Sequence, residues 1–458
     1  MRLAVTPAYP DNLSTHPGKI MNMIPIKHSI VALSLLYALP LWSVELQDIE
    51  ADYPYLEKLY HHLHRNPELS FHEEKTAKRL SKELNAVGFK VTEGVGGHGI
   101  VGVIENGKGP TVLIRADMDG LPIEEKTGLP YASRTQVTDD LGNTVNTMHA
   151  CGHDVHMTVF AGVARRLAAA RSEWSGTLVM IGQPAEERGA GARAMISDGL
   201  FERFPRPDYA LGLHVKAAFP AGQVGYIAGY AMANVDSVDI RIHGIGGHGA
   251  YPHTTKDPVV LAAAIINSLQ TLVSREISPL ESAVVTVGSI HGGTKHNIIP
   301  DYVDLQLTVR SYSDSTREKL LSGIKRIART QALVTGLPRD KLPVVSIRDE
   351  YTPALYNNPQ LTQRLVPVLT QQLGAERLVE VSPVMGGEDF SQYGRVEPKI
   401  PSFFFWLGAI DPKIVKAAQK SGENLPSLHS AHLAPLPRPT IVTGVEAMTA
   451  AALDLFSN

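Results

Sequence analysis

The chain is organised around residues 148–156, which read Met148-His149-Ala150-Cys151-Gly152-His153-Asp154-Val155-His156. This stretch holds the only cysteine of the sequence, together with three histidines and an aspartate. Cys151 and His153 flank a glycine, so a tight turn would direct a thiolate and an imidazole at one point. Both groups are common ligands of zinc-like ions. A buried structural thiol is the alternative interpretation, since a free cysteine usually belongs to the core.

The size and composition of the chain limit its class. With 458 residues it exceeds one typical core, and we expect two domains, one inserted into the other. A hydrophobic content of 43% and a charged content of 19% are typical of an ordered globular protein. The net charge of −3 gives no electrostatic basis for binding nucleic acid or an anionic membrane surface. Eighteen histidines favour metal chemistry, and one cysteine excludes an intramolecular disulfide framework.

Residues 1–45 predict a leader. A basic segment precedes the apolar run 29–42, which is too short to span a bilayer comfortably. We therefore expect export to the periplasm or the exterior by a signal peptide that starts near Met21 or Met23. An uncleaved apolar helix packed on the body, and hence a cytoplasmic protein, is the alternative. Export favours Cys151 as a ligand, because a metal-bound thiolate is protected from unwanted pairing in an oxidising compartment.

Two apolar strands are expected to stop at metal-binding residue types. The predicted strand 111–116 runs into Asp117 and Asp119, whose side chains project to one side because strand side chains alternate. The predicted strand 209–213 leads directly to His214. Polar groups at the carboxyl ends of strands are where open α/β sheets place their sites.

A third strand, 177–181, leads to Glu186 and Glu187. In an extended loop adjacent side chains diverge, so one carboxylate could bind a metal while the other faces a metal-bound water. Taken singly, this pair could be an ordinary solvated one, and His214 or His429 could be a satisfied structural histidine. The prediction of a site therefore depends on the whole set.

From about residue 234 the pattern of expected strands and helices changes, and this change predicts an inserted domain. Its expected elements are a strand at 235–243, a helix at 258–274, strands at 283–290 and 303–310, a helix at 316–333 and a candidate last strand at 344–348. We expect an α/β protein with a larger catalytic domain in two parts, 46–233 and 343–458. The insertion, 234–342, is expected to be a ferredoxin-like α/β sandwich that serves as lid and dimerisation domain.

Together these stretches resemble the M20 metallopeptidase-like amidohydrolases, and most closely the branch of hippurate hydrolase, N-acyl-amino-acid amidohydrolases and auxin-conjugate hydrolases. The resemblance runs in family order from about residue 50 to the end. The matching stretches are 64–73, 114–125, 149–156, 183–192, 212–215, 246–252, 297–301, 386–390 and 428–430.

The resemblance implies a site for two divalent ions per subunit, Zn²⁺ or Mn²⁺, with Ni²⁺ or Co²⁺ as alternatives. The implied ligands are Cys151 as the bridge, His153, Glu187, His214 and His429. Glu186 is the implied general base, and Asp119 the aspartate that orients the site. In the wider family the position of Asp117 is a histidine ligand and the bridge is an aspartate, and this chain departs from both. His432 is an alternative to His429, because the sequence after His429 differs from the family pattern.

The resemblance also implies one more catalytic residue, His248, and a substrate-binding set. His248 resembles the histidine that stabilises the oxyanion, often in the neighbouring subunit's site. Arg310 is a candidate clamp for a substrate α-carboxylate, because a guanidinium binds a carboxylate through two bonds; a plain surface arginine is the alternative. Asn297 and Gly387 join this set.

We therefore expect an exported metal-dependent enzyme that hydrolyses the amide bond of N-acyl amino acids or hippurate-like conjugates. The expected partners are a small-molecule substrate and a second copy of the chain, with no nucleic acid and no stable membrane span. A dipeptidase or an N-acetyl-diaminopimelate-type deacetylase is the alternative within enzymes. A catalytically silent small-molecule-binding protein on the same scaffold is the alternative from another class.

Overall fold

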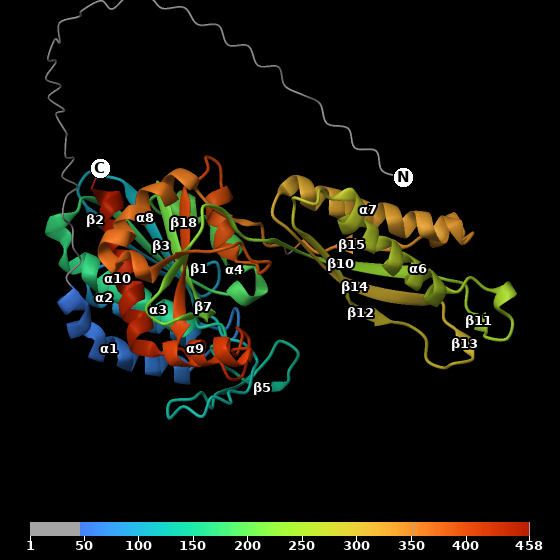
Figure 1. Ribbon diagram of the computed structural model, residues 1–458, viewed down its shortest axis with the longest axis horizontal. Helices are drawn as coiled ribbons and strands as arrows, with labels where there is room; N and C mark the ends of the chain where they lie inside the picture. Colours follow the sequence, from blue (N-terminus) through green and yellow to red (C-terminus); the bar gives the residue numbers. More distant parts are fainter. Residues whose placement is uncertain (1–45, 350, 458) are drawn as a thin grey trace, which may run out of the picture. The chain divides into compact units, whose positions relative to one another are not determined.

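The computed structural model describes residues 46–349 and 351–457, so the predicted leader lies outside the described residues. This part of the chain forms a large sheet and a small sheet, each with its own helices (Figure 1). In spatial order the large sheet contains β1 (Lys90–Val95), β2 (Gly99–Asn106), β6 (Gly176–Gln183), β3 (Thr111–Asp117), β7 (Tyr209–Pro220), β18 (Ser402–Ile410), β8 (Val224–Tyr226) and β17 (Leu378–Glu380). The predicted α/β fold class is confirmed.

The centre of the large sheet is parallel, since β6, β3, β7 and β18 all run in the same direction. Such strands are buried on both faces and are apolar along their whole length. Every residue of β18 is buried. Helices α1 (Leu46–Arg65), α3 (His153–Ala169) and α10 (Pro437–Phe456) pack against one another and share the main hydrophobic core with the sheet.

Gly152 fixes the start of α3. Its φ is +83°, and a Cβ at this position would lie 2.4 Å from Cγ2 of Val215 on β7. Only glycine fits such a left-handed backbone at so close an approach. The turn at Gly152 therefore brings Cys151 and His153 against the β7 strand.

Strand β7 is longer than predicted. The expected strand stopped before His214, but β7 continues through it to Pro220. The reason is β18, which pairs with β7 in register from Ser402↔Ala210 to Gly408↔Lys216. The prediction that His214 follows the end of its strand was therefore wrong.

The small sheet has the order β12 (Ala283–His291), β14 (Tyr302–Ser311), β10 (Asn234–His243) and β15 (Val344–Ile347), and all its pairs are antiparallel. Helices α6 (Pro258–Thr271) and α7 (Asp314–Val334) cover one of its faces and complete a separate hydrophobic core (Figure 1). Because β15 pairs with β10, this sheet continues beyond residue 342, where the insertion was expected to end. A two-stranded ribbon, β11 (Gly247–His248) with β13 (Ile298–Ile299), belongs to the same insertion.

The other helices and strands include α2 (Glu74–Ala86) and α8 (Pro359–Leu373), which add buried leucines to the main core, and several short elements. The short elements are α4 (Gly191–Ser197), α5 (Leu200–Arg203), α9 (Pro412–Ser421), β4 (Gln136–Thr138), β5 (Thr144–Asn146), β9 (Gly229–Met232) and β16 (Leu355–Asn357).

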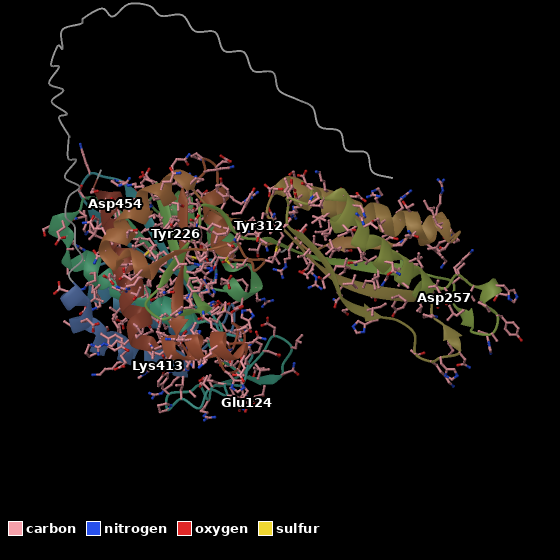
Figure 2. The ribbon with its side chains drawn as sticks, viewed as in Figure 1. Glu124, Tyr226, Asp257, Tyr312, Lys413 and Asp454 are labelled. Carbon is pink, nitrogen blue, oxygen red and sulfur yellow. The ribbon has the colours of Figure 1, made fainter. Side chains whose placement is uncertain are left out.

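Helix α6 is unusually apolar. Together with the turn that follows it, Pro258–Glu276 is long and apolar enough, by length and composition alone, to cross a membrane, and 33% of that window is buried. Asp257, which is labelled in Figure 2, caps the helix by accepting hydrogen bonds from two following backbone N–H groups. Leu261 and Ile265 belong to the core of the small domain. Packing against the small sheet therefore explains one face of this helix.

Candidate metal centre

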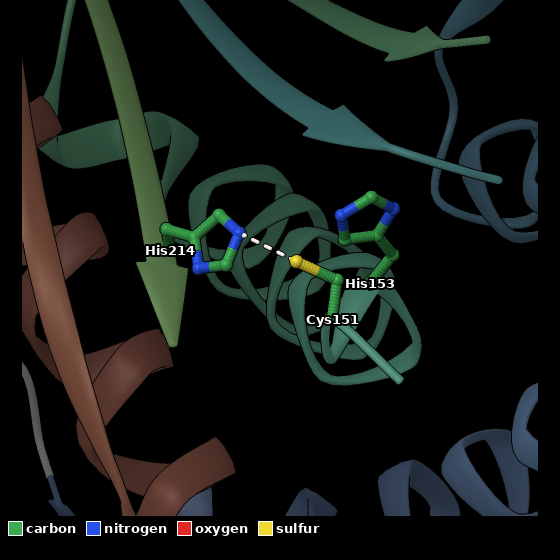
Figure 3. Close-up of side chains that lie close together, drawn as sticks. All are labelled: Cys151, His153 and His214. Atoms are coloured by element: carbon green, nitrogen blue, oxygen red, sulfur yellow. Dashed lines mark hydrogen bonds between the residues drawn. The ribbon is translucent and has the colours of Figure 1, made fainter. Parts of the chain in front are cut away.

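The five predicted ligands come together from separate parts of the chain. The Sγ atom of Cys151 lies 3.3 Å from Nε2 of His214, and Nε2 of His429 lies 3.3 Å from Oε2 of Glu187. Donor atoms of Cys151, His153 and His214 all lie within 4.8 Å of one another, and so do those of Cys151, Glu187 and His429. In Figure 3 the sulfur of Cys151 lies between the two imidazole rings of the first group. Cys151 belongs to both groups, as a bridging ligand must.

Hydrogen bonds fix the tautomers of the two buried histidines. Nδ1 of His153 donates to the carbonyl of Asp119 at 2.8 Å, and Nδ1 of His214 donates to the carbonyl of Val215 at 2.7 Å. Each Nε2 is therefore the unprotonated nitrogen of the neutral ring and is available as a ligand. Nε2 of His153 and Oε1 of Glu187 are buried without a hydrogen-bond partner, 3.9 Å apart. A cation would satisfy both atoms, so the donor set fits a metal site.

The electrostatics of the pocket also fit a cation. Burial and the Asp119 carboxylate raise the pKa of Glu187 to about 7. Burial and Glu187 raise the pKa of the Cys151 thiol well above its ordinary value. For His153, burial would lower the pKa, but Asp117 and Asp119 outweigh burial and hold it well above its ordinary value. The pocket is thus short of positive charge, and a divalent ion would deprotonate the thiol.

Glu186 and Glu187 do not lie in the extended loop that the sequence suggested. They form a 3₁₀ turn, Glu186–Arg188, which the chain enters through Ala185 at a φ of +51°. In this turn both carboxylates face His153, each with an oxygen 3.9 Å from its Nε2. The prediction that the two side chains diverge was therefore wrong, and the two carboxylates share one pocket.

The neighbours of Glu186 distinguish it from Glu187. An oxygen of Glu186 lies within 4.8 Å of oxygens of Glu388 and Asp389, and the side chain of Glu186 is only 10% exposed. Burial and these two carboxylates raise the pKa of Glu186 well above its ordinary value. A carboxyl group with a raised pKa is suited to exchange a proton near neutral pH.

Asp119 holds the glutamate turn in place. Its carboxylate accepts hydrogen bonds from the Ser70 hydroxyl at 2.6 Å, from the backbone N–H of Glu187 at 3.0 Å and from that of Glu186 at 3.2 Å. Burial would raise the pKa of Asp119, but the His153 imidazole, whose Nδ1 lies 3.3 Å from the carboxylate, and the hydrogen bond from Ser70 outweigh burial and lower the pKa. Asp119 therefore orients a predicted ligand and the predicted base together.

A buried ionic network behind the site was not anticipated from the sequence. The Arg115 guanidinium donates to Asp117 at 2.7 Å, to Glu388 at 2.8 Å and to Asp389 at 2.9 Å. The other oxygen of Asp117 accepts from Nδ1 of His156 at 2.6 Å, so both its oxygens have partners. An arginine within an apolar strand was the available signal, because a buried guanidinium needs buried carboxylates.

The structure also distinguishes His429 from His432. The backbone N–H of His429 donates to the carbonyl of Ala150 at 2.8 Å, and the imidazole belongs to a metal-binding group. Both side chains are exposed, but Nδ1 of His432 donates to the carbonyl of Lys126 at 3.0 Å. Within the described residues His432 belongs to no such group.

The site opens into a cavity of about 640 Å³. Of the predicted substrate-binding residues, Arg310 and Gly387 line this cavity, whereas Asn297, directly before β13, does not. The predicted catalytic residue His248, on β11, does not line it either. Arg310 donates to the Thr308 hydroxyl at 3.0 Å and to the Met385 carbonyl at 3.4 Å. One chain thus supplies part of the predicted substrate-binding set.

Comparisons with known proteins find similar sequences and structures over most of the chain. Residues 113–425 match the sequence model of peptidase family M20/M25/M40. The chain is 36% identical over 355 residues to thermostable carboxypeptidase 2 of Saccharolobus solfataricus, across 77% of this chain and 85% of that protein. It is 36% identical over 354 residues to hippurate hydrolase of Campylobacter jejuni, across 76% and 86%. The crystal structure of Bacillus subtilis YXEP, described as a dinuclear metal binding peptidase from the M20 family, matches with a TM-score of 0.71 and 28% identity, across 89% and 99%.

Proposed function

The chain belongs to peptidase family M20/M25/M40, and from this membership we propose that it is a two-metal amidohydrolase of N-acyl amino acids. The observation that carries the proposal is the convergence of five ligand side chains beside a buried glutamate with a raised pKa. A binding protein without catalytic activity would have no need for a group poised to exchange protons.

The predicted ligands form two groups of donor atoms, and Cys151 belongs to both. We propose that Cys151, His153, Glu187, His214 and His429 would hold two ions, and that Cys151 would be the ligand that the two ions share. Thiolate, imidazole and carboxylate suit Zn²⁺, and Mn²⁺, Ni²⁺ or Co²⁺ fit the same donors. Two bound ions supply Lewis acidity and lower the pKa of a coordinated water.

Glu186 is the proposed general base and acid. It takes a proton from the attacking water and returns it to the departing nitrogen, so that the amide C–N bond breaks and an acid and an amine are released. The hydrogen bond that the Glu186 backbone makes to Asp119 holds the side chain over the ligands. General acid–base groups of this kind contribute about 10²- to 10⁴-fold to the rate.

The substrate side rests on two proposals. Arg310 binds the α-carboxylate of the amino acid, and the backbone at Gly387 lies against the same part of the substrate. His248 and Asn297 act in the site of a second copy of the chain, where His248 stabilises the oxyanion. A homodimer or larger homo-oligomer is therefore part of the proposal.

Export by the leader is also a proposal, and it is supported by the apolar run 29–42 after a basic segment.

Peptidase activity is the second candidate. The same site would hydrolyse any amide whose amine half carries an α-carboxylate, and a relative of the chain is named a carboxypeptidase. An N-acetyl-diaminopimelate-type deacetylase would also use this chemistry. Dipeptides and N-acyl amino acids must therefore be assayed side by side.

The test is amine release from hippurate, N-acetyl amino acids and dipeptides by protein loaded with Zn²⁺ or Mn²⁺. We expect chelation to abolish turnover and Glu186→Gln to lower kcat by about 10²-fold or more at unchanged metal content. Metal content is measured by mass spectrometry. Unchanged turnover in Glu186→Gln would remove this mechanism, and faster release from dipeptides than from N-acyl amino acids would favour the second candidate.

A further inference from the structure

Lys216 lies on the wall of the cavity, two residues after a predicted metal ligand. Residues two apart on a strand project to the same face, so Lys216 and His214 share a face of β7. Trp406 on β18 pairs directly with His214 and belongs to that face as well. All three side chains line the cavity. The large sheet therefore places a cation and an indole next to the metal site.

Two aromatic rings hold the ammonium group of Lys216. Its Nζ lies 4.7 Å from the centroid of the Phe219 ring and 5.1 Å from that of Trp406. Both distances are within the range of cation–π attraction. Trp406 is only 3% exposed, so its ring is a fixed surface. The position of the charge is thus set before any ligand binds.

Lys216 lacks a carboxylate partner, unlike two of the arginines of the cavity. Arg188 pairs with Asp140, and Arg348 pairs with Asp239. Within residues 46–349 and 351–457, no aspartate or glutamate forms an ion pair with Lys216. A half-buried ammonium without a counter-ion is ready to bind an anion, because hydrogen bonds to charged groups are stronger than neutral ones.

A second cation of the cavity, Arg310, also contacts only neutral acceptors, and it comes from the small sheet. Under the proposed function, on which this inference rests, Arg310 binds the α-carboxylate of the amino acid. Lys216 comes from the large sheet, and it is therefore assigned to the other half of the substrate, the acyl group.

We infer that Lys216, Trp406 and Phe219 form an acyl subsite for a carboxylate, so the preferred substrates are amino acids acylated by a dicarboxylic acid. The free carboxylate of a succinyl- or glutaryl-type group accepts hydrogen bonds from Nζ of Lys216, and its methylene groups pack on the Trp406 indole. An apolar acyl group of the same length leaves the ammonium desolvated and unpaired, which is unfavourable. Hydrolysis adds water across the amide: the acyl carbon gains the hydroxyl, the nitrogen gains the proton, and a dicarboxylate and a free amino acid leave.

A matched substrate pair tests the subsite. N-glutaryl-L-phenylalanine and N-pentanoyl-L-phenylalanine have acyl chains of equal length and differ only in a terminal carboxylate or methyl group. We expect the metal-loaded full chain to favour the glutaryl substrate about tenfold or more in kcat/KM. Lys216→Met should bring this ratio close to one, Lys216→Gln should act in the same direction, and Lys216→Arg should keep most of the preference. Lys413→Met, a change at an exposed lysine of α9, is the control and should leave the ratio unchanged (Figure 2).

Other outcomes overturn the inference. Equal kcat/KM values for the two substrates in the wild type reject the subsite and leave the amidohydrolase proposal intact. A second pair, N-acetyl-L-glutamate and N-acetyl-L-glutamine, reports on the amino-acid half: if Lys216→Met changes this ratio and spares the acyl ratio, the assignment to the acyl half is wrong.

A binding measurement distinguishes failure of this inference from failure of the proposed function. If no N-acyl amino acid is hydrolysed, the proposed function fails, and calorimetric titration with glutarate and pentanoate still decides the subsite. Tighter binding of glutarate that Lys216→Met weakens about tenfold supports it. Equal affinities in the wild type and in Lys216→Met reject it.

Discussion

Replacing Asp119 by asparagine tests how the glutamate turn is held. The carboxylate accepts three hydrogen bonds, and two of them come from the backbone N–H groups of Glu186 and Glu187. An asparagine has one acceptor oxygen, and its NH₂ group cannot accept. The variant therefore leaves at least one of the three donors facing an NH₂ group in a buried setting. Leaving a buried donor unsatisfied costs about 1–3 kcal/mol.

That cost should appear in metal binding, because the turn carries the ligand Glu187. About 1–3 kcal/mol corresponds to about 5- to 150-fold in a binding constant. We expect Asp119→Asn to weaken metal affinity within this range, measured by competition with a chromophoric chelator, and to lower kcat of the fully loaded enzyme. Asp304→Asn, which alters an ion pair in the small domain, is the matched control. Unchanged affinity and unchanged kcat in Asp119→Asn would refute the reasoning.

Three further changes probe the same architecture. Cys151→Ala should lower the metal content measured by mass spectrometry, and full occupancy by two ions would contradict its bridging role. Gly152→Ala should destabilise the protein by about 1–3 kcal/mol in urea denaturation, because of the positive φ and the 2.4 Å approach to Val215; an unchanged midpoint would show that the turn relaxes. For His64, burial alone would lower the pKa, but its hydrogen bonds to two buried carboxylates raise it to about 9. The stability that this raised pKa contributes is complete below a pH of about 6.5 and is lost as the pH rises towards 9, by at most about 3 kcal/mol. We therefore expect His64→Gln to flatten the plot of unfolding free energy against pH between about 6.5 and 9. If His64→Gln leaves this plot unchanged, the pH dependence does not come from His64.

The elements that were predicted correctly depend on local signals. Apolar runs fixed the central strands, and the spacing of Cys151 and His153 around a glycine fixed the turn that begins α3. Glycine at this position is informative because few other residues tolerate its backbone angles. Local composition therefore predicted both the α/β fold class and the start of the metal site.

The features that sequence reasoning missed depend on distant partners. The strand that carries His214 is extended by pairing with β18, which lies about 190 residues later in the chain. The turn at Glu186 is held by Asp119 and by Glu73, which accepts a hydrogen bond from the backbone of Ala185 at 2.8 Å. No periodicity within the loop encodes either contact, so the divergent arrangement of the two glutamates was the natural expectation from local geometry.

The assignment of roles within the glutamate pair follows from what each carboxylate faces. Glu187 lies with Cys151 and His429, which can serve as metal ligands, and burial and the Asp119 carboxylate raise its pKa to about 7. Glu186 lies instead beside Glu388 and Asp389, and burial together with these two carboxyl groups raises its pKa well above the ordinary value. When their surroundings shift the pKa values of two neighbouring carboxyl groups apart, the group with the higher pKa can act as acid and base while the other stays ionised. Arg115 binds the same two carboxylates from behind and keeps them close to Glu186. The buried ionic network thus supports the proposal that Glu186, and not Glu187, is the group that accepts and returns a proton.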